Sequence, residues 1–314
     1  MANKQTGYGG QAVIEGVMMG GKYTTVTAVR RQDRTIDFFE CQKKSYPLLN
    51  RLKKVPVLRG IVAILESSAL GTKHLNFSSE VFDQTNETPR SEEKKKSFGF
   101  VIGIAVLGIL SFLFAKFVFT LVPAFLASFF SPIVSHHSGQ IILEGFFKIA
   151  FLLGYIYFVS LTPMMKRVFQ YHGAEHKVIN AFENDLPLSV ENVMNASRLH
   201  YRCGSSFILF SAFISVALYF FVPTDPLWLR LVSRIALIPL DLGIAYEVLR
   251  LTNRVRGIPF LKWLGYPGLW LQLLTTKEPD TDQVEVAIQA FEEMIKREAM
   301  IEGAKSMVNK SHVV

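Results

Sequence analysis

Long apolar stretches occupy the middle of this chain, and most charged residues lie toward its two ends. Four predominantly apolar runs cover residues 98–134, 141–164, 206–222 and 229–249. A transmembrane helix needs about 20 such residues, and the first run is too long for one perpendicular span but too short for two. We therefore expect about four spans, the first of them a tilted or kinked helix.

The flanking segments carry shorter patterns that predict soluble structure. Alternating apolar and β-branched residues over 11–19, 23–31 and 35–42 predict a small antiparallel sheet. Helical spacing over 47–82 predicts a short and a longer helix separated at Pro56. Residues after Pro279 predict an amphipathic helix that begins with acidic residues.

These patterns together predict a mainly α protein: a multi-pass helical membrane protein with a small α+β head. The expected parts are a cytoplasmic head (1–84), a polar linker (85–97), a four-span domain (98–250) that includes a cytoplasmic segment (165–205), an interfacial or re-entrant segment (251–278) and a C-terminal helix and tail (279–314).

Charge places the segments relative to the membrane. Lys and Arg concentrate in 166–202 and 250–262, whereas the connection 131–140 has no charged residue. Cytoplasmic loops carry the Lys and Arg excess, so both termini are expected in the cytoplasm. Two cysteines give no disulfide framework, which fits a reducing compartment. The net charge of +8 is better explained by contact with a lipid bilayer than by nucleic acid.

The segment Tyr171-His-Gly-Ala-Glu-His-Lys177 is the strongest candidate for chemistry. His172 and His176 are four residues apart, so a helix places them on one face. The spacing matches the inverted zincin arrangement, in which two histidines hold zinc and the adjacent glutamate, here Glu175, acts as general base. The alternative is a polar helical turn at a membrane surface.

Three further residues could complete a shell for zinc or another divalent metal: His200, Cys203 and Glu247. With His172 and His176, the pair His200 and Cys203 would form a closed four-ligand set, which is typical of structural zinc. Three ligands would leave a position for water and so a catalytic site. Taken singly, His200 could equally be a hydrogen-bonded polar residue and Cys203 a small buried side chain.

The predicted head contains two charges in apolar surroundings. Glu15 lies in the run 11–19, and Arg59 lies at an apolar helix start. Charges in such settings are seldom left unpaired, so we expect Glu15 and Arg59 to pair with each other.

Five motifs, in this order, resemble the YqhQ family of bacterial membrane proteins. They are Gly10-Gln-Ala-Val-Ile-Glu-Gly-Val-Met-Met19, Val57-Leu-Arg-Gly60, His172-Gly-Ala-Glu-His-Lys177, His200-Tyr-Arg-Cys-Gly204 and Thr275-Thr-Lys-Glu-Pro-Asp280. The resemblance covers nearly the whole chain. It implies a bacterial membrane protein of unknown function, commonly described as a predicted metal-dependent enzyme.

The sequence thus predicts an inner-membrane, metal-dependent hydrolase whose site lies at the cytoplasmic face. The alternative is a non-catalytic scaffold or assembly factor that binds a protein partner through its head, and a transporter ranks third.

Overall fold

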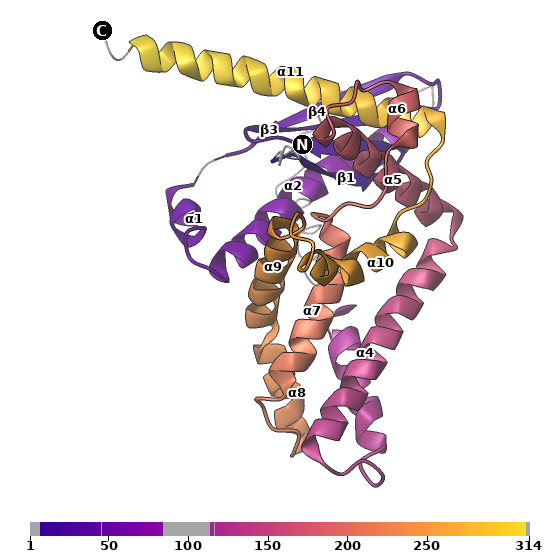
Figure 1. Cartoon of the computed structure of the whole chain (residues 1–314), viewed down its shortest axis with the longest axis vertical. Helices are drawn as coiled ribbons and strands as arrows, with labels where there is room; N and C mark the ends of the chain where they lie inside the picture. Colours follow the sequence, from indigo (N-terminus) through magenta and orange to yellow (C-terminus); the bar gives the residue numbers. More distant parts are fainter. Residues whose placement is uncertain (1–6, 45, 84–113, 116, 312–314) are drawn as a thin grey trace.

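The computed structural model describes residues 7–44, 46–83, 114–115 and 117–311, and the side chains of 305–311 are not described. A sheet with α5, α6 and α11 forms one end of the molecule, and α4, α7, α8 and α9 extend from it as a helical bundle (Figure 1). The chain is mainly helical with a small antiparallel sheet, as predicted.

The sheet has four antiparallel strands in chain order: β1 (Gly9–Val13), β2 (Gly16–Gly20), β3 (Thr24–Arg30) and β4 (Ile36–Gln42). The predicted single strand 11–19 is wrong, because a tight turn divides it into β1 and β2. Glu15 occupies this turn with a φ of 50°, in the left-handed region.

The expected pair between Glu15 and Arg59 is also wrong. The Glu15 carboxylate forms an ion pair with Arg167 of α5 (Pro163–Glu183). Arg59 pairs with Glu247 of α9 (Ile238–Arg254), with 2.6 Å between Arg59 Nε and Glu247 Oε1. Both charges are paired, but each one joins the N-terminal segment to a distant helix.

One hydrophobic core unites segments from the whole length of the chain. It lies between the sheet, α5, α6 (Val190–Asn195) and α11 (Thr281–Ser311). The helix predicted after Pro279 is confirmed: Asp280 Oδ1 accepts a hydrogen bond of 2.8 Å from the Gln283 amide, and Val284 and Phe291 are buried. The N-terminal sheet and the C-terminal helix therefore both support α5.

The helices α1 (Pro47–Leu52) and α2 (Leu58–Asp83) follow the sheet and confirm the predicted separation at Pro56. His74 of α2 is fully buried against β3, with Nε2 2.8 Å from Thr25 Oγ1 and Nδ1 2.6 Å from Thr27 Oγ1. Burial lowers the pKa of His74 to about 4, and the charge on Lys73 acts in the same direction.

We expect His74 to make the protein less stable in acid. Its folded pKa of about 4 lies below the ordinary value of 6.5, so the unfolded chain binds the proton first. The contribution of the neutral His74 to the free energy of unfolding should be fully present above about pH 6.5. It should fall by roughly 3 kcal/mol by pH 4. Denaturant unfolding of the unmodified protein and of His74→Gln across this range measures the difference. Identical pH slopes for the two proteins would contradict the assignment.

Among the residues that the structure describes, one helix is long and apolar enough to cross a membrane, α4 (His137–Ser160). Shorter apolar helices are Phe117–Phe129 and α7 (Gly204–Tyr219). Part of the predicted first span, 98–113 with Lys116, lies outside the described residues. The predicted span 229–249 comprises two helices, α8 (Leu227–Ala236) and α9, which are separated at Leu237 because Pro239 enters the first turn of α9.

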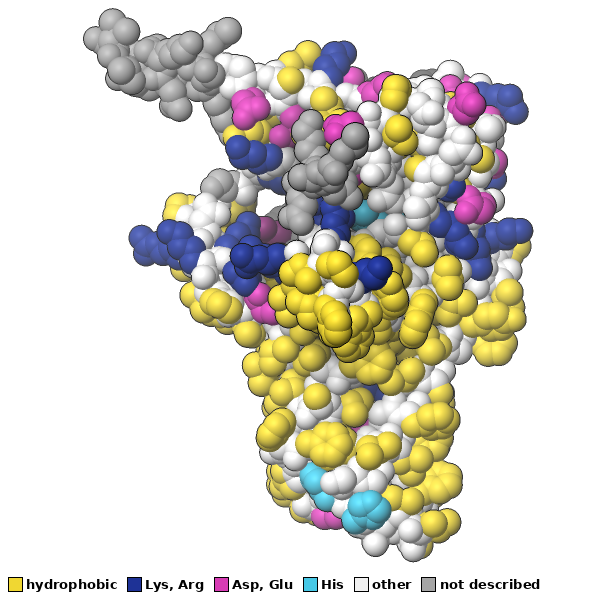
Figure 2. All heavy atoms as spheres, viewed as in Figure 1, with side chains coloured by type: hydrophobic (Ala, Val, Ile, Leu, Met, Phe, Trp, Pro, Cys, Tyr) yellow, Lys and Arg dark blue, Asp and Glu magenta, His cyan; other side chains and the backbone are white. Residues whose placement is uncertain are grey.

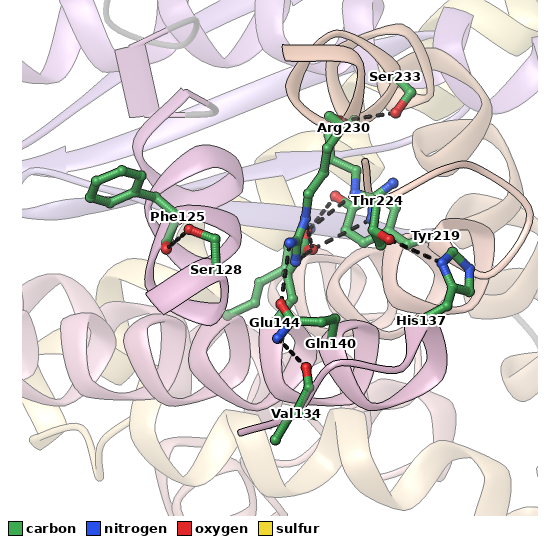
Figure 3. A network of polar contacts seen from close by, with 12 residues as sticks. Phe125, Ser128, Val134, His137, Gln140, Glu144, Tyr219, Thr224, Arg230 and Ser233 are labelled. Carbon is green, nitrogen blue, oxygen red and sulfur yellow. Dashed lines mark hydrogen bonds and ion pairs between the residues drawn. The ribbon is translucent and has the colours of Figure 1, made fainter. Parts of the chain in front are cut away.

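The short helix α8 has its charged side chains inside and its apolar side chains outside. Its buried residues are Arg230 and Arg234, whereas Trp228 and Val232 are exposed. Both arginines bind the fully buried carboxylate of Glu144 on α4, with 2.6 Å from Arg230 Nη2 to Oε2 and 3.2 Å from Arg234 Nε to Oε1 (Figure 3). Figure 2 shows that hydrophobic side chains cover much of the surface of this half of the molecule.

The predicted interfacial segment 251–278 contains η1 (Lys262–Gly265) and α10 (Tyr266–Thr275). Large apolar side chains on it are exposed, namely Phe260, Trp263 and Trp270. The segment lies between the bundle and the sheet-containing end (Figure 1).

Candidate metal centre

The helix α5 carries His172, Glu175 and His176. Pro163 lies in its first turn, where a missing amide donor costs nothing, and the helix continues to Glu183. His172 and His176 lie on one face, with ring centroids 4.5 Å apart. Gly173 lets the chain at Lys277 pass close to α5, because a Cβ at Gly173 would lie 2.1 Å from the Lys277 carbonyl oxygen.

Cys203 joins these histidines from the start of α7. It is the N-cap residue of that helix, and its Sγ lies 3.2 Å from His172 Nε2. Among the described residues, His172, His176 and Cys203 form a group whose ligand atoms all lie within 4.8 Å of one another. One metal ion fits such a spacing, because metal–nitrogen and metal–sulfur bonds of about 2.0–2.3 Å reach from the centre of the group.

Hydrogen bonds orient both imidazole rings toward the thiol. His172 Nδ1 donates to the Thr275 carbonyl at 2.8 Å, and His176 Nδ1 donates to the Arg198 carbonyl at 2.6 Å. A carbonyl can only accept, so the proton must lie on Nδ1 and the lone pair of a neutral ring on Nε2. Metal-binding histidines typically make this second bond, which sets their tautomer and direction.

The charges of the group suit metal binding by sulfur. Burial would raise the pKa of the Cys203 thiol, but His176 and His172 lower it well below its usual range. Burial likewise opposes protonation of His172, yet the attraction of Cys203 raises its pKa to about 9. The helix dipole at the start of α7 also favours a thiolate.

Glu175 is buried beside the group and has lost its ordinary acidity. Burial raises the pKa of its carboxyl, against the opposing charges of His176 and His172. The backbone amide of Gly10 donates to this carboxyl. A Cβ at Gly10 would lie 2.9 Å from Glu175 Cγ, so glycine permits this close approach of β1.

A cavity of about 430 Å³ opens beside the group. Its walls include His172, Glu175, His176, His200 and Cys203. Residues of the N-terminal segment and the sheet, including Gly10 and Lys43, and of α2, including Ser67, also line it. The carboxyl of Glu175 and the metal-ligand group therefore face one solvent-connected space.

The other two predicted ligands lie outside the group of three. His200 borders the cavity, but its Nε2 is 3.7 Å from Glu183 Oε2 and has no hydrogen-bond partner among the described residues. Burial lowers the pKa of His200. Burial also opposes ionisation of Glu183, but His200 and Arg202 hold its pKa at about 2. Glu247 pairs with Arg59 and does not line this cavity.

Sequence reasoning missed the groups that support the candidate ligands. The carbonyls of Thr275 and Arg198 belong to the backbone, so the residue types at these positions do not predict the two hydrogen bonds. Gly10 and Thr275 do lie in two of the motifs that carry the family resemblance, and these motifs meet at α5. A glycine such as Gly10 in these motifs was the available sign that another segment approaches the backbone closely at that position.

Comparison with known proteins places the chain among proteins without an assigned activity. Residues 55–297 match the family described as "Protein of unknown function (DUF1385)". The chain is 62% identical over 299 residues to "Uncharacterized protein YqhQ" of Bacillus subtilis (strain 168), covering 94% of each chain. No solved structure matches.

Proposed function

Since the chain belongs to the DUF1385 family, whose function is unknown, we propose from its own geometry that it is a metal-dependent hydrolase of the bacterial cell membrane. The observation that carries this proposal is the group His172, His176 and Cys203, in which both histidines are oriented through Nδ1. Zinc is the metal that this combination of nitrogen and sulfur ligands suits best.

Three protein ligands are the number found in catalytic zinc sites, where the fourth position stays open. Among the described residues the group contains His172, His176 and Cys203 and leaves His200 outside, so the set of three favours catalysis over a closed structural site. A metal held there would supply Lewis-acid polarisation of a water or substrate oxygen.

Glu175 is the candidate general base. Burial raises the pKa of its carboxyl, so the carboxylate is a stronger base than that of an exposed glutamate. It would take a proton from the attacking water and return it to the leaving group as the substrate bond breaks. The amide of Gly10 holds the carboxylate in place on the cavity wall.

The helical bundle supports a membrane location. On α8 the charged side chains lie inside and the apolar side chains lie outside. This distribution is the reverse of that on a water-exposed helix, and it suits a helix that faces lipid. α4 is long enough to span, and exposed Trp263 and Trp270 fit an interfacial belt. With the Lys and Arg excess on the sheet-containing side, we propose several spans, with the candidate site and both termini in the cytoplasm.

Replacing Glu175 by glutamine tests the catalytic part. The purified protein would be loaded with zinc in detergent and assayed with p-nitrophenyl acetate, p-nitrophenyl phosphate and a fluorogenic peptide mixture. We expect the unmodified protein to hydrolyse one probe class, and Glu175→Gln to lose about 100-fold or more of that rate while retaining its zinc.

The matched control is Glu191→Gln, which removes an exposed carboxylate on α6 and should leave the rate unchanged. Full hydrolysis by Glu175→Gln would overturn the role of Glu175. A zinc-loaded protein that leaves every probe intact would instead favour the scaffold alternative, in which any metal is structural.

A further inference from the structure

The segment 46–57 connects the sheet to α2, and we call it the basic arm. It contributes no residue to the hydrophobic core clusters of the described residues. Its helix α1 has no buried residue. Tyr46, Leu48 and Val55 are exposed, Leu48 with 68% of its surface accessible. α1 projects to one side of α2 and α9 (Figure 1). Apolar side chains displayed in this way need another surface to cover them.

The charge around the arm has one sign. Residues 42–65 contain Lys43, Lys44, Arg51, Lys53, Lys54 and Arg59 and no acidic residue. Lys53 pairs with Glu66 at 2.6 Å, and Arg59 pairs with Glu247. No ion pair links Lys44, Arg51 or Lys54 to any residue that the structure describes. An anionic surface would complement these cations.

The arm is attached at the boundary between the two halves of the molecule. Its last residue, Val57, donates its amide to Glu247 Oε1 at 3.2 Å and packs against Gly243 of α9. On this side of the molecule, Lys and Arg side chains gather at the level where the hydrophobic surface of the bundle begins (Figure 2). The arm is thus continuous with the apolar surface and lies on its head-side rim.

We propose that the basic arm lies on the headgroup surface of the cytoplasmic leaflet and binds anionic lipid. Leu48 and Val55 enter the interface, and Lys44, Arg51 and Lys54 contact the phosphates, as in interfacial amphipathic helices. The inference rests on the membrane location proposed above, but not on the hydrolase activity.

A fluorescent label at the arm tests this in the full chain. The variant Leu48→Cys, in a background with Cys41→Ser and Cys203→Ser, carries an environment-sensitive dye on its single thiol and is reconstituted into nanodiscs. We expect a blue shift of the emission in discs containing phosphatidylglycerol relative to discs of phosphatidylcholine alone. About 1 M NaCl should reverse the shift, because the Debye length then falls to about 3 Å.

The matched control is a label at Gln32→Cys, an exposed position in the turn between β3 and β4, which should show no shift. The substitutions Lys44→Gln, just before the arm, and Arg51→Gln and Lys54→Gln, within it, remove three positive charges. Together they should abolish the difference between the two lipids. The same emission from Leu48→Cys in both lipids would overturn the proposal. Failure of the protein to enter nanodiscs would contradict the membrane location itself, and the arm's role with it.

Discussion

Replacing Cys203 by serine is expected to weaken zinc binding by more than about 100-fold. Loss of supporting hydrogen bonds around a zinc ligand already costs about 10- to 100-fold in affinity, and removal of a ligand atom costs more. Sγ of Cys203 lies 3.2 Å from His172 Nε2, and the thiol pKa is lowered well below its usual range by His176 and His172 although burial opposes this. A hydroxyl at this position would bind zinc poorly. Competition with a chelator of known affinity measures the change.

Two variants serve as controls for this prediction. Cys41→Ser removes the only other cysteine, which lies on β4, and should leave the affinity unchanged. His200→Ala should also retain zinc, because His200 is outside the group of three. If His200→Ala lost zinc as completely as Cys203→Ser, the site would be a closed four-ligand set, and the catalytic interpretation would be wrong.

Replacing Glu144 by glutamine is expected to destabilise the protein by about 3–5 kcal/mol, because it leaves buried charges uncompensated. Glu144 is the carboxylate to which both Arg230 and Arg234 bind, and all three side chains are nearly inaccessible. Tyr219 packs on the Arg234 guanidinium at 4.0 Å but provides no negative charge. In a protein of this size, such a loss should lower the Tm in detergent by roughly 10 °C.

The control is Glu292→Gln, an exposed glutamate on α11, for which we expect a change in Tm of no more than about 1 °C. Glu144→Asp should show an intermediate loss, because it retains the charge but shortens the reach to the arginines. A Tm for Glu144→Gln equal to that of the unmodified protein would show that the cluster does not hold α8 against α4.

Local spacing allowed part of the centre to be predicted. Residues four apart on a helix share a face, so His172 and His176 could be paired from the sequence. The contact with Cys203 depends on how α7 begins beside α5, which no spacing along the chain specifies. For the same reason Glu247, at a plausible distance in sequence, proved to be the partner of Arg59.

The fold shows the same limit. Apolar periodicity was sufficient for the helix after Pro279, where Val284, Ile288 and Phe291 are buried. It located α2 but not its buried face, because Leu65 is exposed whereas His74 and Ser78 are buried. It failed at Glu15, where a turn interrupts an apolar run, and at Pro239, where one apolar run becomes two helices. The segment 229–249 was misleading because the arginines of α8 face inward and are buried, whereas its apolar side chains Trp228 and Val232 are exposed.

Zinc K-edge X-ray absorption of the purified protein, prepared without chelator, tests the central claim most directly. We predict close to one zinc per chain, with one sulfur ligand at about 2.3 Å and nitrogen ligands at about 2.0 Å. Absence of stoichiometric zinc, or bound zinc without a sulfur ligand, would contradict a metal centre built from His172, His176 and Cys203.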